Sequence, residues 1–305
     1  ANNVSDSSNA VSITVDTTAP GKPTISTSDT TTSDTTPTIE GTAEAGSTVK
    51  LFNGSIELGS TTADGSSGAF TITSSALTAG SYDLTVTATD AANNVSDSSN
   101  AVSITVDTTA PGKPTISTSD TTTSDTTPTI EGTAEAGSTV KLFSGSSELA
   151  STTANTDDSF TIISPSLSEQ DFVFTVTATD AANNVSDSSN AVSITVDTTN
   201  PAQPTITTGT TTTSDTTPTI EGTAEINSTI NLISNGSSIG TATTDGSGNF
   251  SVTPSELAEG SYSLTVTATD AANNVSDSSN AVSITVDTTA PGKPTISTSD
   301  TTTSD

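Results

Sequence analysis

The sequence predicts an all-β chain of tandem two-sheet sandwiches, and three observations lead to this fold class. A segment of about 90 residues recurs along the chain, apolar and polar residues alternate within it, and turn dipeptides separate the alternating runs. Alternation with a period of two places one face of a strand on a core and the other in water, as in antiparallel sheets. No helical periodicity of useful length interrupts these runs.

The repeat defines the domain organisation. The motif ATDAANNVSDSSNAVSITVDTT starts at Ala88, Ala178 and Ala268, and its final part opens the chain. A repeat of this length can form its own core, unlike a solenoid repeat that needs its neighbours. We therefore predict a partial repeat over 1–16 (the end of an F–G loop and strand G), domains over 17–107, 108–197 and 198–287, and a partial repeat over 288–305 (strand A of a next domain). Because the chain opens inside a recurring motif, we expect it to be a segment of a longer protein.

The first of these domains, called here the first repeat, contains seven expected strands. Tyr82, Leu84 and Val86 alternate with Asp83 and Thr85, and dipeptides such as Asn-Gly at 53–54 and Asp-Gly at 64–65 mark hairpin turns. Seven short strands with frequent turns are typical of an immunoglobulin-like sandwich. The core of each sandwich should hold about a dozen apolar side chains. The expected strands cover 24–27 (A), 37–43 (B), 48–52 (C), 56–63 (D), 69–73 (E), 81–89 (F) and 101–106 (G).

The residue near the start of strand F has two interpretations. Tyr82 and Tyr262 stand there in the first and third repeats, and Phe172 stands there in the second. A tyrosine at this place either bonds its hydroxyl to the backbone, as a corner tyrosine does, or packs only its ring into the core. The pattern leaves both open.

Composition excludes most functional classes. The chain has 35 acidic and 5 basic residues, a net charge of -30, and neither His nor Cys. Nucleophilic triads and zinc sites need those missing side chains, and no pattern indicates an aromatic-lined cleft for a carboxylate pair, so we expect no enzyme. The charge disfavours nucleic acid and anionic membranes as partners, and no apolar run of about 20 residues predicts a membrane span.

Acidic residues gather where one repeat meets the next. In a sandwich of seven antiparallel strands, the start of strand A lies at the same end as the B–C and F–G loops, so the linker Asp should approach a Glu and an Asp of those loops. Converging carboxylates repel unless a cation binds them, and Ca²⁺ accepts six to eight oxygen ligands. We predict Ca²⁺ ligands in three trios: Asp16, Glu44 and Asp90; Asp107, Glu135 and Asp180; Asp197, Glu225 and Asp270.

Further residues extend or weaken this metal hypothesis. Asn93, Asn183 and Asn273 could add carbonyl oxygens, and Asp29 with Asp34 forms a second candidate cation pair in the A–B loop. The alternative is that all these acids are solvated loop residues that keep the protein soluble.

Several consecutive motifs resemble a known family. TPTIEGTAEAGSTVKLF, DGSSGAFTI, GSYDLTVTATDAANNVS and NAVSITVDTTAP resemble the bacterial Ig-like (BIg) repeats of giant type I-secreted surface adhesins and biofilm-associated proteins. The resemblance covers all three repeats and both partial ones. It implies a cell-surface or extracellular location and interdomain Ca²⁺ bound by the linker Asp and the F–G loop Asp, such as Asp107 and Asp180. The chain departs from the pattern at 155–160 and 197–204.

These inferences predict a structural role. We expect a linear rod of extender repeats in an adhesin or extracellular fibre, stiffened by Ca²⁺. Its partners would be neighbouring repeats of the same chain, and a host or surface ligand would bind a tip domain outside this sequence. The alternatives are a glycan- or ice-binding module that uses exposed Thr rows, and a fibre that self-associates into a matrix or sheath.

Overall fold

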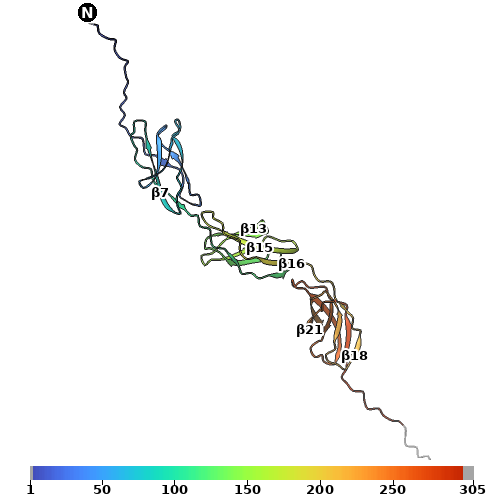
Figure 1. Cartoon of the computed structure of the whole chain (residues 1–305). Helices are drawn as coiled ribbons and strands as arrows, with labels where there is room; N and C mark the ends of the chain where they lie inside the picture. The colour runs from blue at the N-terminus through green and yellow to red at the C-terminus, as the bar shows by residue number, and fades with distance from the viewer. Residues whose placement is uncertain (1–2, 298–305) are drawn as a thin grey trace, which may run out of the picture. The chain divides into compact units, whose positions relative to one another are not determined.

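The computed structural model describes residues 3–297, and every regular element in this range is a β-strand (Figure 1). The strands form three sets of eight, one set in each repeat. The predicted all-β fold is therefore confirmed. Each repeat is described by itself below.

The first repeat contains one strand more than predicted. Six of the seven expected strands lie within about one residue of their predicted places, because alternating burial fixes them. Its strands are β1 (Thr24–Ile25), β2 (Thr30–Thr32), β3 (Thr38–Thr42), β4 (Thr48–Asn53), β5 (Ile56–Thr62), β6 (Ala69–Thr73), β7 (Gly80–Thr89) and β8 (Val102–Val106).

The other two repeats follow the same order. The second contains β9 (Thr115–Ile116), β10 (Thr121–Thr123), β11 (Thr129–Thr133), β12 (Thr139–Ser144), β13 (Ser147–Thr153), β14 (Ser159–Ile163), β15 (Gln170–Thr179) and β16 (Val192–Val196). The third contains β17 (Thr205–Ile206), β18 (Thr211–Thr213), β19 (Ile220–Thr223), β20 (Thr229–Ser234), β21 (Ser237–Thr243), β22 (Asn249–Val252), β23 (Gly260–Thr269) and β24 (Val282–Val286).

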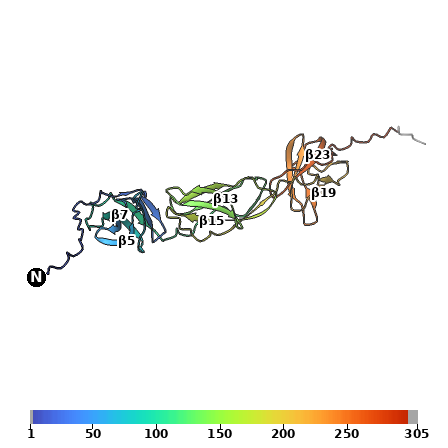
Figure 2. The same cartoon turned by 90° about the horizontal axis from the view of Figure 1, so that it is seen from above.

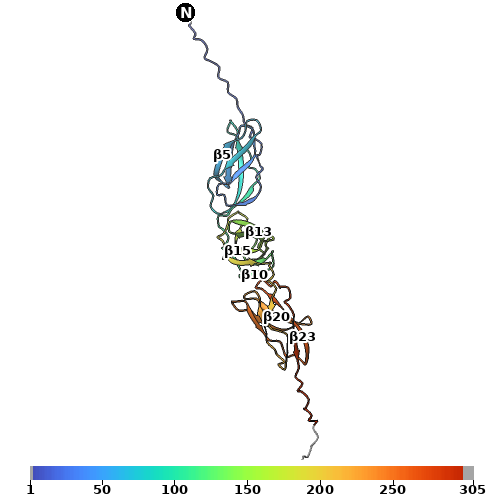
Figure 3. The same ribbon diagram turned by 90° about the vertical axis from the view of Figure 1, so that its right-hand side faces the viewer.

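Each repeat forms a three-stranded and a five-stranded sheet. In the first repeat their orders are β1-β3-β6 and β2-β8-β7-β4-β5. The second repeat repeats this with β9-β11-β14 and β10-β16-β15-β12-β13, and the third with β17-β19-β22 and β18-β24-β23-β20-β21. Figure 2 labels one strand of each sheet in the third repeat, β19 and β23, and Figure 3 shows the neighbouring β20 and β23.

The prediction that the sheets are purely antiparallel is wrong at one edge. The expected strand A is shortened to β1, which pairs antiparallel with β3, whereas β2 lies in the expected A–B loop and pairs parallel with β8. Between them the chain crosses from one sheet to the other, and Asp29 accepts a hydrogen bond from the Ser103 N–H at 2.8 Å. Asp120 and Ser193 repeat this bond at 2.8 Å in the second repeat. The threonine run of β2 has no apolar alternation, which is why its pattern gave no strand signal.

The inward faces of the two sheets form the core. In β7, Leu84 and Val86 are fully buried, whereas Thr85 and Thr87 are half-buried on the outer face. The buried core cluster has 12 residues in the first repeat and 13 in the third, close to the predicted dozen. Gly41 is required here, because a Cβ at its position would lie 2.6 Å from the Phe70 ring.

The tyrosines near the start of strand F act as corner tyrosines. The Tyr82 hydroxyl donates to the Thr78 carbonyl at 2.8 Å, and that of Tyr262 donates to the Ala258 carbonyl at 3.0 Å. In the second repeat Phe172 instead stacks on Phe174, with ring centroids 5.7 Å apart. The hydroxyl bond decides between the two interpretations in favour of the corner role.

Candidate functional site

Each linker begins with an aspartate that ends strand G. The Asp107 N–H donates to the Thr32 carbonyl at 2.9 Å, which joins it to the edge strand β2 of the first repeat. Its carboxylate oxygen Oδ1 accepts the Thr109 N–H at 2.9 Å and forms a short Asx-type turn. Asp197 and Asp287 make the same two bonds in the next repeats. The sequence Asp-Thr-Thr therefore gives the linker a defined direction as it leaves the sheet.

The aspartate of the F–G loop is held by its own loop. Asp180 Oδ1 accepts the backbone N–H of Asn184 at 2.8 Å, and Asp180 Oδ2 accepts its side-chain Nδ2 at 2.8 Å. Between them Asn183 has a φ of 67°, a left-handed conformation that Asn tolerates better than most residues. Asp90 and Asp270 form the same loop with Asn94 and Asn274.

A single asparagine connects the linker to this loop. Nδ2 of Asn184 donates both to the Asp107 carbonyl oxygen at 2.8 Å and to Asp180 Oδ2 at 2.8 Å. We call this arrangement the linker site, and each repeat has one. Asn94 joins Asp16 and Asp90 in the first repeat, and Asn274 joins Asp197 and Asp270 in the third. The structure thus brings together two of the three predicted residues in each trio.

The bridging asparagine is the residue that sequence reasoning missed. Asn93, Asn183 and Asn273 were the predicted additional ligands, but the next residue in each Asn-Asn pair makes the bonds. The Asn-Asn pair in each F–G loop was the sequence signal that could have indicated a bridging asparagine. Only the left-handed φ of the first one shows which side chain turns towards the linker.

Hydrogen bonds favour the ionised form of two of the loop aspartates, Asp90 and Asp180. The Asn94 side chain lowers the pKa of Asp90 below its usual value. Burial raises the pKa of Asp180, but the bonds from Asn184 outweigh that effect and leave the pKa lowered. Negative charge is therefore favoured beside the linker carbonyl.

The third predicted member, a glutamate, is placed differently. The Glu135 carbonyl accepts the Ser138 N–H at 3.0 Å, so its backbone shapes the B–C loop. Its side chain lines a surface hollow with Lys113, Asp157 and Asp158. Glu44 lies beside Lys22 in a similar hollow, and the Glu225 carbonyl accepts from Ser228 and Thr244. Within residues 3–297, no three His, Cys, Asp or Glu side chains form a group that could hold a metal ion. The oxygen donors suit Ca²⁺ chemically, and its binding stays a prediction.

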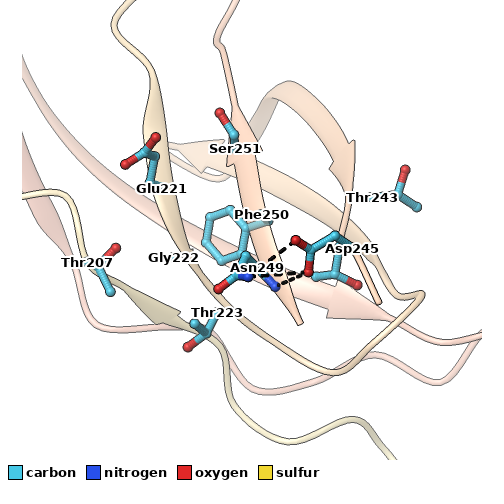
Figure 4. A pocket seen from close by; sticks show the side chains of 10 residues that line it. Thr207, Glu221, Gly222, Thr223, Thr243, Asp245, Asn249, Phe250 and Ser251 are labelled. Atoms are coloured by element: carbon cyan, nitrogen blue, oxygen red, sulfur yellow. Dashed lines mark hydrogen bonds between the residues drawn. The ribbon is translucent and has the colours of Figure 1, made fainter. Parts of the chain in front are cut away.

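A larger hollow lies on the third repeat (Figure 4). It measures about 600 Å³ and is lined by Thr207, Glu221, Thr223, Asp245 and Phe250, among others. The carboxylate of Asp245 accepts hydrogen bonds from Asn249 within its own turn, and the Phe250 side chain is only 4% exposed. The hollow therefore offers no aromatic platform, and one of its two acids serves the turn.

A search for helices long and apolar enough to cross a membrane found none among residues 3–297.

Comparisons with known proteins identify the repeats. The bacterial Ig-like domain family matches residues 10–108, 112–198 and 200–288. A search of curated proteins gave no match.

Three solved structures with a similar fold are distant in sequence. A biofilm-associated protein BSP domain has 15% identity over 90% of this chain and 67% of its own, with a TM-score of 0.24. The fibronectin(III)-like modules of Clostridium thermocellum CbhA have 16% identity over 57% of this chain and 93% of their own, with a TM-score of 0.41. A marsupial T cell receptor has 11% identity over 81% of this chain and 95% of its own, with a TM-score of 0.43. TM-scores this low add no weight to the family match. The family match itself confirms the resemblance seen in the motifs. The chain belongs to the bacterial Ig-like domain family and contains three tandem copies of this domain.

Proposed function

We propose that the chain is an extender, or stalk, of a bacterial cell-surface adhesin or extracellular fibre, and that Ca²⁺ stiffens its linkers. Tandem bacterial Ig-like domains support the structural role, and a composition without His or Cys offers no nucleophilic triad. The longest strand of each sandwich has 10 residues and spans roughly 30 to 34 Å, so each sandwich with its loops would add on the order of 40 Å to a stalk. In this proposal, the length of the stalk follows from repetition of one unit.

The linker site is the single observation that carries this proposal. The Asp107 N–H is bonded to the sandwich before it, and the Asp107 carbonyl accepts from Asn184 of the sandwich after it. A linker bonded at both of its backbone groups has less freedom than a flexible tether. Pro111 and Pro114 restrict the chain further, since proline fixes φ. Such a restricted linker suits a spacer that must keep its two ends at a defined separation.

Calcium would strengthen this joint. The Asp107 carbonyl and the Asp180 carboxylate already lie within 2.8 Å of one nitrogen, so two oxygen donors converge. We assign Glu135 and Asn183 to the ion as further oxygen donors, and Glu135 would have to turn from its hollow beside Lys113 to reach it. Water would complete the six to eight ligands that Ca²⁺ takes. A bound divalent cation would also offset part of the net charge of -30.

A calorimetric titration tests the ion. We expect one Ca²⁺ per linker site, and Asp180→Asn should abolish binding at one of the three sites. Asp187→Asn is the matched control, because it removes the same charge from the same loop, where only the Asp187 carbonyl accepts a bond from Ser186. Unchanged stoichiometry in Asp180→Asn would refute the proposed ligand set.

One observation favours a second candidate function, ligand binding. A hollow of about 470 Å³ on the outer face of the first repeat is lined by Phe52, Val95, Thr87 and Thr89. Val95 is 56% exposed, and an apolar surface beside hydroxyl groups suits a sugar ring. The third repeat has Ile233 where the first has Phe52. A glycan array on the wild type and on Phe52→Ala tests this reading, and absence of any glycan retained selectively by the wild type would remove it.

A further inference from the structure

The linker is also held at the opposite end of the sandwich, by the loop between strands E and F. Oε2 of Glu169 accepts the Thr198 hydroxyl at 2.9 Å, and both of its carboxylate oxygens accept the Thr199 hydroxyl, at 2.8 and 3.0 Å. Glu259 makes the same bonds to Thr288 at 3.0 Å and to Thr289 at 2.8 and 3.0 Å. We call this arrangement the glutamate clamp.

The first repeat has no glutamate at this position. Sheet register defines the equivalence, because Gly80, Gln170 and Gly260 pair with Val106, Val196 and Val286, the residues that precede the linker aspartates. The residue before each of them is Ala79, Glu169 or Glu259. A methyl group accepts no hydrogen bond. Within the described residues, the hydroxyls of Thr108 and Thr109 have no hydrogen-bond partner, although their linker also reads Asp-Thr-Thr.

The clamp and the aspartate turn act on the same linker residue. Asp197 Oδ1 accepts the Thr199 N–H at 3.0 Å, so the turn fixes the Thr199 backbone and Glu169 fixes its side chain. Bonds from hydroxyls to a carboxylate are charge-assisted and stronger than neutral ones. The hydroxyl of Thr199 lowers the pKa of Glu169, and that of Thr289 lowers the pKa of Glu259, with Thr198 and Thr288 adding to each effect. Both glutamates therefore stay ionised in the folded chain under mildly acidic conditions.

We propose that the glutamate clamp grades the stiffness of the chain: it holds the linkers after the second and third repeats without a cation, whereas the linker after the first repeat lacks this hold and bends more. The first and second repeats are joined instead by a backbone bond, from the Ser33 N–H to the Ala182 carbonyl at 3.1 Å. The proposal deepens the stalk function, because it assigns stiffness to a second device beside the linker site. A chain with alternating clamped and unclamped linkers would have hinges at positions set by single residues.

Distance measurements between spin labels test the clamp directly. The chain has no cysteine, so labels attach only at introduced sites. Ser60, Ser151 and Thr241 are exposed positions on the equivalent edge strands β5, β13 and β21. The pair Ser60→Cys with Ser151→Cys spans the linker after the first repeat, and Ser151→Cys with Thr241→Cys spans the linker after the second.

In chelator, we expect a broader distance distribution across the first of these linkers than across the second. Glu169→Ala should remove the difference by broadening the second, and Ala79→Glu should narrow the first. Thr198→Val with Thr199→Val should reproduce the effect of Glu169→Ala, because these changes remove the hydroxyls and keep the side-chain shape. Melting curves of the labelled chains show that each variant is folded.

The outcomes separate this inference from the stalk proposal. Equal widths in the unsubstituted chain, or widths that Glu169→Ala and Ala79→Glu leave unchanged, would overturn the clamp. If Ca²⁺ narrows both distributions while Glu169→Ala has no effect, the clamp fails and the calcium-stiffened stalk stands. If Glu169→Ala broadens its distribution while Ca²⁺ changes neither width, the clamp stands and calcium stiffening fails.

Discussion

The two ends of each sandwich hold the linker in different ways. At the start of a repeat, Asn184 donates to the backbone carbonyl of Asp107, and Asn94 and Asn274 do the same for Asp16 and Asp197. At the end of a repeat, Glu169 accepts bonds from the linker hydroxyls, and Ala79 of the first repeat does not. The linker site is therefore uniform along the chain, whereas the clamp varies.

The difference follows from what each contact recognises. Asn184 binds a backbone carbonyl, which any linker residue would provide, and it also holds the F–G loop through Asp180. Glu169 binds two threonine side chains, and within the described residues its carboxylate accepts no other hydrogen bond. A contact that shapes its own loop is costly to lose, and one that serves only the linker can change from repeat to repeat.

The largest expected effect comes from breaking one sandwich. Phe160 is 1% exposed, and Phe160→Ala should destabilise the second repeat by about 3 to 5 kcal/mol through the cavity it leaves. Because Asn184 belongs to that repeat, the bond to Asp107 should be lost with it, while the bond between Asn94 and Asp16 persists. Amide hydrogen exchange resolved by residue measures this. Simultaneous loss of protection at Asn94 would show that the linker sites do not depend on their own sandwiches.

A smaller effect should follow from removing the bridging asparagine. Asn184→Ala leaves the Asp180 carboxylate and the Asp107 carbonyl without their shared donor, and should cost about 1 to 2 kcal/mol. Urea unfolding of the second repeat measures the change in free energy. Asn183→Ala is a poor control because of its positive φ, so Asn190→Ala, which removes bonds to Ile116, serves as the comparison for a loop amide. A negligible change for Asn184→Ala would contradict the structural role of the linker site.

The corner tyrosine gives a matched pair of changes. Tyr262→Phe removes the hydroxyl bond to Ala258 and should destabilise the third repeat by about 1 kcal/mol. The second repeat has Phe172 at this position, where the ring stacks on Phe174 instead. Phe172→Tyr should therefore be close to neutral or slightly stabilising. Thermal unfolding of the two variants decides this, and a strongly destabilised Phe172→Tyr would show that the second repeat has no acceptor for the hydroxyl.

The smallest effect is the acid sensitivity of the clamp. Hydrogen bonds from Thr289 and Thr288 lower the pKa of Glu259, so its folded pKa lies below its unfolded pKa. Its contribution to stability is therefore present above the ordinary glutamate pKa and is lost as the pH falls through the folded value. Carbon-detected NMR of the Glu259 carboxyl against pH measures this midpoint. A midpoint at or above that of an unperturbed glutamate would contradict the clamp geometry.

The sequence predicted those features that burial or topology imposes. Alternation along 81–89 placed Leu84 and Val86 in the core, because only one face of a strand can be buried. The order of antiparallel strands likewise brought Asp107 near Asp180, and the structure joins them through Asn184.

Other features depend on local geometry that the pattern does not contain. The parallel pairing of β2 with β8 involves a threonine run with no distinct faces. The bridging role of Asn184 depends on the left-handed turn at Asn183, and the contacts of Glu169 depend on the direction in which the linker leaves strand G. The position of Glu135 beside Lys113 also depends on loop conformation rather than on strand order.

Small-angle X-ray scattering of the full chain tests the central claim most directly. We predict that millimolar Ca²⁺ gives a larger maximum dimension and a stiffer profile than chelator does, together with a higher melting temperature. Asp180→Asn should reduce this response, because one linker would no longer bind the ion. Superimposable scattering curves in Ca²⁺ and in chelator would contradict the claim that calcium at the linkers makes the chain a stiff spacer.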